Sequence, residues 1–196
     1  RRGMQPSLSV DYTNGATTHL GRGFSLGGES AISRCQRTFR RDGSPGAISF
    51  GDDDPFCLDG SRLVLTSGKH GAIGAAYVTE LEDNRKVVID DVDQSGPLRW
   101  LVLDPSGLSH RYGVSAAGRV EGVRVRGTPS TVRLAWLREV SEDRFGNGVS
   151  YQYLKVDSAA VERTLKRIAY TTQTQAGAPS ANRFVDFFYD QRTEPA

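Results

Sequence analysis

The stretch from Pro55 to Leu65, PFCLDGSRLVL, predicts a β-hairpin and points to an all-β fold. Two short strand candidates, Phe56–Leu58 and Arg62–Leu65, flank the dipeptide Asp59-Gly60. An Asp-Gly pair favours a type I′ turn, because both central residues of that turn need a positive φ and these two residue types tolerate it. The turn is specified more firmly than the strand register, because the apolar alternation is uneven.

The same pattern of short strand and turn extends in both directions from this hairpin. Upstream, Leu8, Val10 and Tyr12 alternate with polar residues, as in a half-buried strand. Arg37–Gly46 is polar and predicts a loop, and only Ser158–Lys166 has helical character. The other strand candidates are Phe24–Leu26, Ala31–Arg34, Tyr77–Leu81, Lys86–Asp90, Leu98–Leu103, Leu108–Tyr112, Arg119–Arg126, Thr131–Val140, Val149–Leu154, Leu165–Thr171 and Arg183–Tyr189. The sequence therefore predicts an all-β fold of sequential antiparallel hairpins.

Composition narrows the class of protein. The 196 residues are 37% hydrophobic and 24% charged, which is typical of a globular chain, and 22 glycines fit many turns. A net charge of +2 does not indicate a nucleic-acid binder. No apolar run approaches the ~18 residues of a membrane-spanning helix, and no signal peptide is recognised. The chain opens at Arg1 and closes in TEPA, so we expect residues 1–196 to be one segment of a longer polypeptide.

Two of the predicted hairpins share an internal sequence repeat. Asp104-x-x-Gly107-x-x-x-x-Tyr112 recurs 39 residues later as Asp143-x-x-Gly146-x-x-x-x-Tyr151. Each copy predicts strand, turn and strand, with the Asp carboxylate bonding backbone N–H groups of the turn. Gly107 and Gly146 are expected at equivalent turn positions. A repeated hairpin favours an extended hairpin sheet over a Greek-key sandwich.

Cys35 and Cys57 are too few for a disulfide scaffold or a cysteine-based metal site. They could pair in an oxidising compartment, or they could be two buried free thiols. The residues leave both alternatives open, and proximity of the two cysteines is expected in either case.

Catalytic and metal-binding patterns are incomplete. His19, His70 and His110 lie on unrelated segments, and no Ser-His-Asp order is recognised. Asp91, Asp93 and Ser95 resemble the start of a calcium loop, but Val102 stands where a bidentate Glu is required. A solvated acidic turn is the favoured interpretation. We therefore expect no enzyme activity and no cofactor.

Two charged clusters also have ordinary structural interpretations. Asp52-Asp53-Asp54 is interpreted as a polar turn, because adjacent side chains of an extended strand point in opposite directions. A basic cluster, formed by Arg34, Arg37, Arg40 and Arg41, is interpreted as a solvated face. Aromatic residues on the strand candidates are expected in the core or in cross-strand pairs rather than on a sugar-binding platform; they are Trp100, Tyr112, Trp136, Tyr151, Tyr153, Phe184, Phe187, Phe188 and Tyr189.

Eight motifs occur in an ordered set along the chain: Pro6–Tyr12, Leu20–Leu26, Ile32–Cys35, Phe56–Leu65, Trp100–Gly113, Asp143–Tyr153, Arg167–Tyr170 and Val185–Arg192. This ordered set resembles the Rhs/YD-repeat polymorphic toxin family. The resemblance is to the SpvB-like N-terminal region that is shared with the B components of insecticidal toxin complexes. Phe24 and Pro55 are mild departures, at positions where Trp and a basic residue are usual.

This resemblance implies a structural role for the chain. In that family such strands belong to a large β-sheet that coils into a hollow shell around a C-terminal toxin domain. The expected partners are the remainder of its own polypeptide, the enclosed toxin domain and a delivery or pore component, in a secreted bacterial toxin. No nucleic-acid partner and no direct membrane insertion are expected. The alternative is an extracellular all-β binding module, such as an adhesin or a carbohydrate-binding domain.

Overall fold

The structure of the protein, a computed structural model, describes residues 4–18, 21–81, 83–124, 130–155, 163–173 and 183–190. These residues form antiparallel strands and one short helix, which confirms the all-β fold class. The elements are β1 (Ser9–Thr18), β2 (Gly21–Gly27), β3 (Ala31–Arg34), α1 (Phe39–Asp42), β4 (Phe56–Leu58), β5 (Ser61–Ser67), β6 (Ala76–Thr79), β7 (Lys86–Asp93), β8 (Gly96–Leu103), β9 (Ser109–Tyr112), β10 (Arg119–Arg124), β11 (Ser130–Glu142), β12 (Asn147–Lys155), β13 (Arg163–Gln173) and β14 (Arg183–Asp186).

Helix occurs where the sequence predicted a loop. The four residues of α1 lie inside the segment Arg37–Gly46. The helical character predicted for Ser158–Lys166 is wrong for residues 163–166, which begin β13, while residues 158–162 lie outside the described residues. A long pairing with β12 determines this conformation, because it satisfies the backbone of β13 along most of its length.

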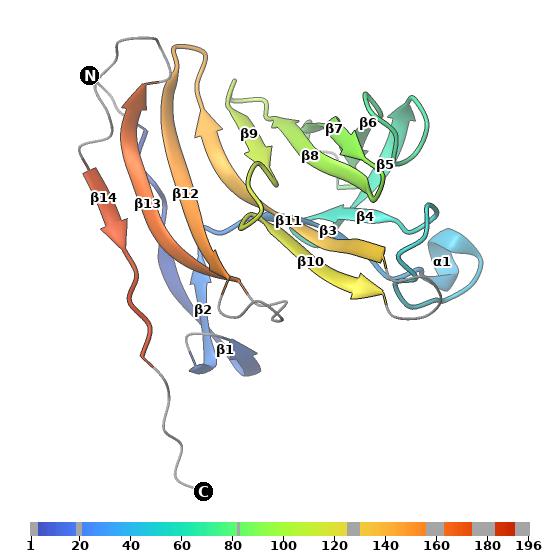
Figure 1. The fold of residues 1–196 in the computed structure, drawn as a ribbon, viewed down its shortest axis with the longest axis horizontal. Helices are drawn as coiled ribbons and strands as arrows, with labels where there is room; N and C mark the ends of the chain where they lie inside the picture. The colour runs from blue at the N-terminus through green and yellow to red at the C-terminus, as the bar shows by residue number, and fades with distance from the viewer. Residues whose placement is uncertain are drawn as a thin grey trace, which may run out of the picture.

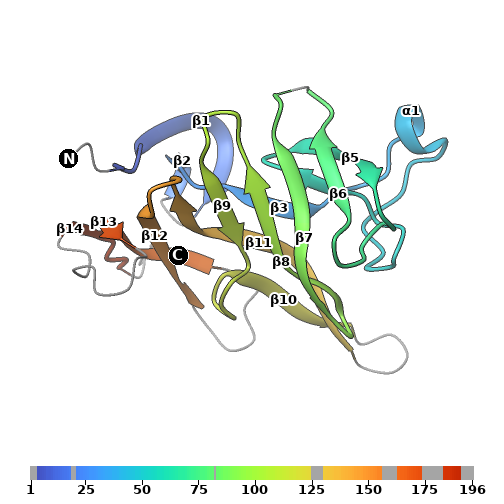
Figure 2. The same ribbon diagram turned by 90° about the horizontal axis from the view of Figure 1, so that it is seen from above.

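Eight strands close on themselves into a barrel. Strands β3 to β9 pair in the order of the sequence, and β11 then joins β9 back to β3. Figures 1 and 2 show this barrel at one end of the molecule together with α1, while β12, β13 and β14 extend toward the other end. Pairing between sequence neighbours was predicted and is confirmed for most strands. Closure was not predicted, because it depends on contacts of β11 with strands far from it in the sequence.

Strand β11 belongs to both parts of the sheet. Its first part pairs with β10 on one side and β3 on the other, with Trp136 opposite Ile32. Its second part pairs with β9 and β12, with Ser141 opposite both His110 and Val149. From there the sheet continues through β13 to β14. A single 13-residue strand therefore connects the closed barrel to an open sheet.

The hairpin predicted from Asp59-Gly60 is confirmed. Leu58 pairs with Ser61, so the turn has two residues, and φ is 50° at Asp59 and 81° at Gly60. The Asp59 carboxylate also accepts a hydrogen bond of 2.9 Å from the backbone N–H of Ala31, at the start of β3. The turn residue thus aligns its own hairpin with the neighbouring strand.

Aromatic side chains fill the barrel. Trp100 packs on Trp136 with a distance of 5.5 Å between ring centroids, and Phe56 lies 4.9 Å from Trp100. Both tryptophans are fully buried. Edge-to-face packing of this kind adds to the stabilisation from buried apolar area. The barrel interior is therefore a packed core rather than a channel.

A second core covers the open sheet. It is formed by buried side chains of β12 and β13, namely Val149, Tyr151, Tyr153, Leu165 and Ile168. Met4, Leu8 and Leu26 pack against it from the N-terminal segment and the β1–β2 hairpin. Figure 1 shows that hairpin beside β12 and β13, although β1 and β2 form a separate two-stranded sheet.

Candidate functional site

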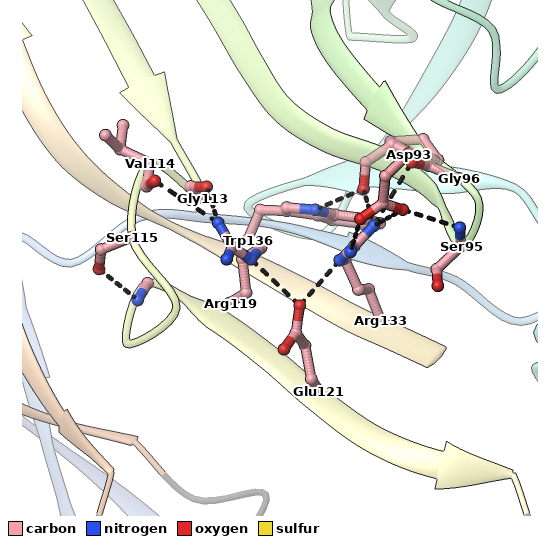
Figure 3. A network of polar contacts seen from close by, with 12 residues as sticks. Asp93, Ser95, Gly96, Gly113, Val114, Ser115, Arg119, Glu121, Arg133 and Trp136 are labelled. Atoms are coloured by element: carbon pink, nitrogen blue, oxygen red, sulfur yellow. Dashed lines mark hydrogen bonds and ion pairs between the residues drawn. The ribbon is translucent and has the colours of Figure 1, made fainter. Parts of the chain in front are cut away.

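A network of arginine and carboxylate side chains fastens β11 to the turn between β7 and β8 (Figure 3). Arg133, on β11, is only 4% exposed. Its Nη1 donates to Asp93 Oδ1 at 2.9 Å and to the Pro97 carbonyl at 3.1 Å, and its Nε donates to Glu121 Oε1 at 2.8 Å. Trp136 Nε1 donates to the same Pro97 carbonyl at 3.1 Å. One guanidinium therefore connects the β7–β8 turn, β10 and β11.

The charges of this network are matched. A hydrogen bond from Arg133 holds the pKa of Asp93 below its usual value. Glu121 accepts from a second guanidinium, that of Arg119, at 3.1 Å. Arg119 in turn donates to the Gly113 carbonyl at 2.9 Å, in the segment that follows β9. The network thus connects the segment after β9 with β10, β11 and the β7–β8 turn, close to the pairing of β9 with β11 that closes the barrel.

The candidate calcium residues lie in this network or beside it. The Asp91 carboxylate pairs with Arg99 at 3.1 Å, and the Asp93 carboxylate is bound by Arg133. The backbone N–H of Ser95 donates to Asp93 at 2.7 Å, and Val102 is buried in the barrel core. Among the described residues, no three His, Cys, Asp or Glu side chains are grouped to hold a metal ion. The acidic turn is ion-paired to arginine rather than simply solvated.

One arginine and one carboxylate of the predicted surface clusters are buried. Arg34 is 8% exposed and donates through Nε to the Arg133 carbonyl at 2.9 Å. Asp54 is fully buried and accepts from the backbone N–H groups of Ser49 and Phe50 at 3.0 and 2.6 Å. The interpretation of Arg34 as solvated is therefore wrong, and the polar turn predicted at Asp52–Asp54 has a buried carboxylate at its end. Sequence spacing gave no sign of the burial of Arg34, since its partner Arg133 lies on a distant strand, whereas the partners of Asp54 belong to its own loop.

Cys35 and Cys57 are joined by a disulfide, with a Cα–Cα distance of 6.0 Å. The bond follows the pairing of β3 with β4, in which Ser33 lies opposite Cys57. The backbone N–H of Cys35 donates to the Pro55 carbonyl at 2.8 Å and extends that ladder. The disulfide reinforces the β3–β4 strand pair of the barrel.

The two copies of the repeat have the same turn geometry. Gly107 has a φ of 86° and Gly146 a φ of 77°, and the N–H of each donates at 3.0 Å to the carbonyl of the Asp three residues earlier. The side chain of Asp104 accepts from the Ser106 N–H at 2.8 Å. In the second copy, the side chain of Asp143 accepts the corresponding hydrogen bond from the Phe145 N–H, also at 2.8 Å. Both turns are thus capped by their own aspartate.

The first copy carries a group that the sequence analysis missed. His110 Nε2 lies 3.1 Å from Asp104 Oδ2, and His110 Nδ1 lies 2.8 Å from Ser141 Oγ. These three residues line a cavity of about 400 Å³ between the barrel and the open sheet, together with Arg138 and Tyr151. Residue order gave no sign of this arrangement, because the pairing of β9 with β11 creates it.

The other histidines have different surroundings. His70 stacks on Phe56 with 4.9 Å between ring centroids, and its Nε2 lies 3.0 Å from the Asp54 carbonyl. It lines a second cavity, of about 310 Å³, at the end of the barrel where Arg34 is buried. His19 lies outside the described residues.

The open sheet ends in an apolar edge. Strand β14 pairs with β13 and, among the described residues, has no partner on its other side. Phe184 is 55% exposed but pairs across the strands with Ala169, in agreement with the predicted cross-strand packing. Phe188 is 90% exposed and lies beyond the end of β14, so the prediction of core or cross-strand packing is wrong for it. The strand ends at Asp186, earlier than predicted. In the β1–β2 hairpin, Val10 and Tyr12 are also exposed.

Trp100, Trp136 and Tyr112, in contrast, are buried as predicted for core aromatics. Within the described residues, no helix has the length and apolar character needed to cross a membrane.

Known structures share this fold. The crystal structure of TcdB2-TccC3 matches with a TM-score of 0.70 and 20% identity, over 98% of this chain and 11% of that chain. The N-terminal domain of effector protein SpvB from Salmonella typhimurium strain LT2 matches with a TM-score of 0.64 and 22% identity, over 91% of this chain and 66% of that one. The Photorhabdus luminescens Tc holotoxin pore matches with a TM-score of 0.67 and 21% identity, over 97% of this chain and 10% of that chain.

At these identities the likeness shows the fold alone, and the chain spans about a tenth of the length of the toxin-complex chains. A search of curated proteins found no match. Family membership follows from the sequence itself, because the family model for SpvB, the Salmonella virulence plasmid 65kDa B protein, matches residues 1–188. The chain therefore belongs to the SpvB family.

Proposed function

We propose that this chain is a structural segment of a toxin-complex protein, and that its sheet is part of a hollow β-shell enclosing a C-terminal toxin domain. The observation that carries the proposal is the fold likeness to TcdB2-TccC3, which extends over 98% of this chain but 11% of that one. A segment with this relation to a much longer chain is expected to serve as one piece of a larger wall. On this view the protein is exported, and its wall function requires no catalysis.

Within the part of the chain that the structure describes, one edge of β14 has no partner strand, and this supports a continuing sheet. A strand edge presents a row of N–H and C=O groups that remain unsatisfied until another strand pairs with them. The exposed Phe184 side chain beside this edge would be covered by such a neighbour. The partner of this segment is therefore the remainder of its own polypeptide, joined by main-chain hydrogen bonds. The enclosed toxin domain and a delivery or pore component are the further partners on this proposal.

Hydrogen exchange tests the edge directly. Amide exchange on β14 is compared between residues 1–196 expressed alone and the full-length polypeptide. We expect protection of β14 to rise at least tenfold in the full-length protein, while amides in the barrel strands β7 and β8 exchange equally in both. Size-exclusion chromatography of residues 1–196 alone should show self-association.

The opposite outcome would favour the binding module. A monomer that resists dilution, melts sharply and exchanges β14 amides as slowly as the full-length protein would be an independent domain. The burial of Trp100 and Trp136 argues against a sugar-binding platform built from these two side chains.

A further inference from the structure

The cavity between the barrel and the open sheet contains a hydrogen-bonded chain of serine, histidine and aspartate. Ser141 lies on β11, His110 on β9 and Asp104 in the turn before β9. The distance from Ser141 Oγ to His110 Nδ1 is 2.8 Å, and that from His110 Nε2 to Asp104 Oδ2 is 3.1 Å. A nucleophile in contact with a base that is oriented by a third group is the arrangement that activates a serine hydroxyl.

Hydrogen bonding to Asp104 determines which histidine nitrogen carries the proton. Asp104 Oδ1 accepts from the Ser106 N–H of its own turn, which leaves Oδ2 to accept from His110 Nε2–H. His110 Nδ1 is then unprotonated and accepts the hydrogen bond from Ser141 Oγ–H. Burial lowers the pKa of His110, against the opposing effect of Asp104. Arg138 and Arg85 also lower that pKa, which favours the neutral ring.

A β-bulge adds Arg138 to the same face. Residues three apart on a regular strand point to opposite faces, so Arg138 and Ser141 would normally be separated. The register of β11 against β9 shifts between Arg138 and Val140, however, so that Arg138 lies opposite Tyr112 and Ser141 opposite His110. Bulges of this kind re-aim side chains beside active sites. Arg138 and Ser141 therefore line one cavity.

One N–H group of Arg138, at Nε, makes no hydrogen bond to the described residues. Its Nη2 donates to the Gly28 carbonyl and to Tyr151 Oη, the latter at 3.2 Å. Its Nε is buried and has no hydrogen-bond partner among the described residues. An unpaired buried donor is costly unless a ligand satisfies it. The guanidinium of Arg138 lines the cavity, and its positive charge is suited to stabilise an oxygen on which negative charge develops.

The hairpin itself does not require the histidine. In the second copy of the repeat, Val149 occupies the position equivalent to His110. There the second carboxylate oxygen of Asp143 accepts from Asn147 Nδ2 at 2.9 Å, and the turn is capped without a histidine. The serine–histidine contact is thus an addition to the first copy rather than a feature of the repeat.

We propose that Ser141, His110 and Asp104 form an acyl-transfer site that takes small carboxylic esters. The cavity of about 400 Å³ limits the substrate to a small acyl group, and Tyr112, Tyr151 and Met4 supply apolar wall. This activity goes beyond the structural role proposed above and does not depend on it.

The proposed reaction has two steps. Ser141 Oγ attacks the ester carbonyl carbon while its proton passes to His110 Nδ1, and the positive charge of the Arg138 guanidinium stabilises the carbonyl oxygen as it becomes negative. The C–O bond to the alcohol breaks, and the alcohol leaves with the proton from His110. Water then attacks the acyl-serine with His110 again as base, which releases the carboxylic acid and restores Ser141. Asp104 is a positioning residue that keeps Nδ1 of His110 free to accept the proton.

The experiment uses the full-length polypeptide with two probes, a fluorophosphonate and p-nitrophenyl acetate. We expect a phosphonyl adduct on Ser141, identified by peptide mass spectrometry, and release of p-nitrophenol that Ser141→Ala abolishes. Asp104→Asn keeps an oxygen for the turn but cannot accept from His110 Nε2–H, so both rates should fall by about 10²-fold. The rise of the wild-type rate with pH, as His110 loses its proton, should disappear in this variant. Ser150→Ala is the matched control, because Ser150 pairs with Val140 and lies on the opposite face from Val149.

The labelling results distinguish an acyl-transfer site from a purely structural hydrogen-bond chain. Loss of labelling in Ser141→Ala and Asp104→Asn, with Ser150→Ala unchanged and all melting temperatures similar, supports the site. Absence of an adduct on Ser141 in folded wild-type protein overturns it and leaves the three residues as a cross-strand hydrogen-bond chain. Labelling that persists in Ser141→Ala also overturns it.

Discussion

Replacing Arg133 with methionine should weaken the closure of the barrel. Removing one member of a buried ion pair typically costs about 3–5 kcal/mol, because the remaining charge stays buried. Here the side chains of Asp93 and Glu121 are 41% and 26% exposed, so water compensates part of that loss. The Pro97 carbonyl also loses a donor but keeps the one from Trp136. We therefore expect about 2–3 kcal/mol of destabilisation.

Thermal unfolding measures this effect. For a chain of this length, 1 kcal/mol shifts Tm by about 2–4 °C, so Arg133→Met should lower Tm by about 4–12 °C. Arg41→Met is the matched control, because Arg41 and Glu80 form an exposed pair and such pairs contribute about 0–1 kcal/mol. Arg133→Lys should fall between wild type and Arg133→Met, since lysine keeps the charge but lacks the planar fork of donors.

Acid gives an independent check on the same network. The pKa of Asp93 is lowered in the folded state, so its contribution to stability is present above its unfolded pKa of about 3.9 and is lost as pH falls through the folded pKa. The Tm difference between wild type and Arg133→Met should therefore shrink between pH 7 and pH 3. A double-mutant cycle with Asp93→Asn should give a coupling of about 0.5–3 kcal/mol. Zero coupling, or an Arg133→Met effect no larger than that of Arg41→Met, would refute the reasoning.

Three further predictions concern the repeat turns, the disulfide and the buried histidine. Gly107→Val and Gly146→Val should each cost about 1–3 kcal/mol in denaturant unfolding, because both residues have a positive φ; matched unfolding curves would contradict this. Replacing Cys35 and Cys57 by serine should destabilise by about 3 kcal/mol, since the bond spans 22 residues, and unchanged stability would show that the link adds nothing. The pKa of His110 is lowered by burial, so the neutral ring favours folding above the unfolded pKa of about 6.5 and this stability is lost below it. His110→Gln should therefore lose less Tm than wild type between pH 7.5 and pH 5, and equal losses would argue against the shift.

Local chemistry specified much of the fold in advance. The Asp59-Gly60 turn and the repeat turns at Gly107 and Gly146 follow from residue types that tolerate a positive φ. Alternating apolar residues between these turns predicted strands and their pairing with sequence neighbours. These features could be recognised because each depends on residues a few positions apart.

Burial of individual charges could not be recognised in the same way. Arg34 stands in a run that resembles solvated surface, but its Nε donates to the carbonyl of Arg133, on a strand distant in the sequence. Asp54 bonds within its own loop, to the N–H of Ser49, and its burial depends on how that loop packs. Exposure of Phe184 was likewise hidden, because apolar composition does not reveal which strand lies at the edge of a sheet.

The sequence by itself determined the all-β class, the turn positions and the membership of a recognisable family. Only the tertiary structure decided that β11 closes a barrel and that its bulge brings Arg138 and Ser141 to one cavity. The physical reason is the range of the interactions. Turn preferences depend on neighbouring residues, whereas ladder register between β9 and β11 depends on the packing of two cores, and a shift of one residue changes the face that every following side chain occupies.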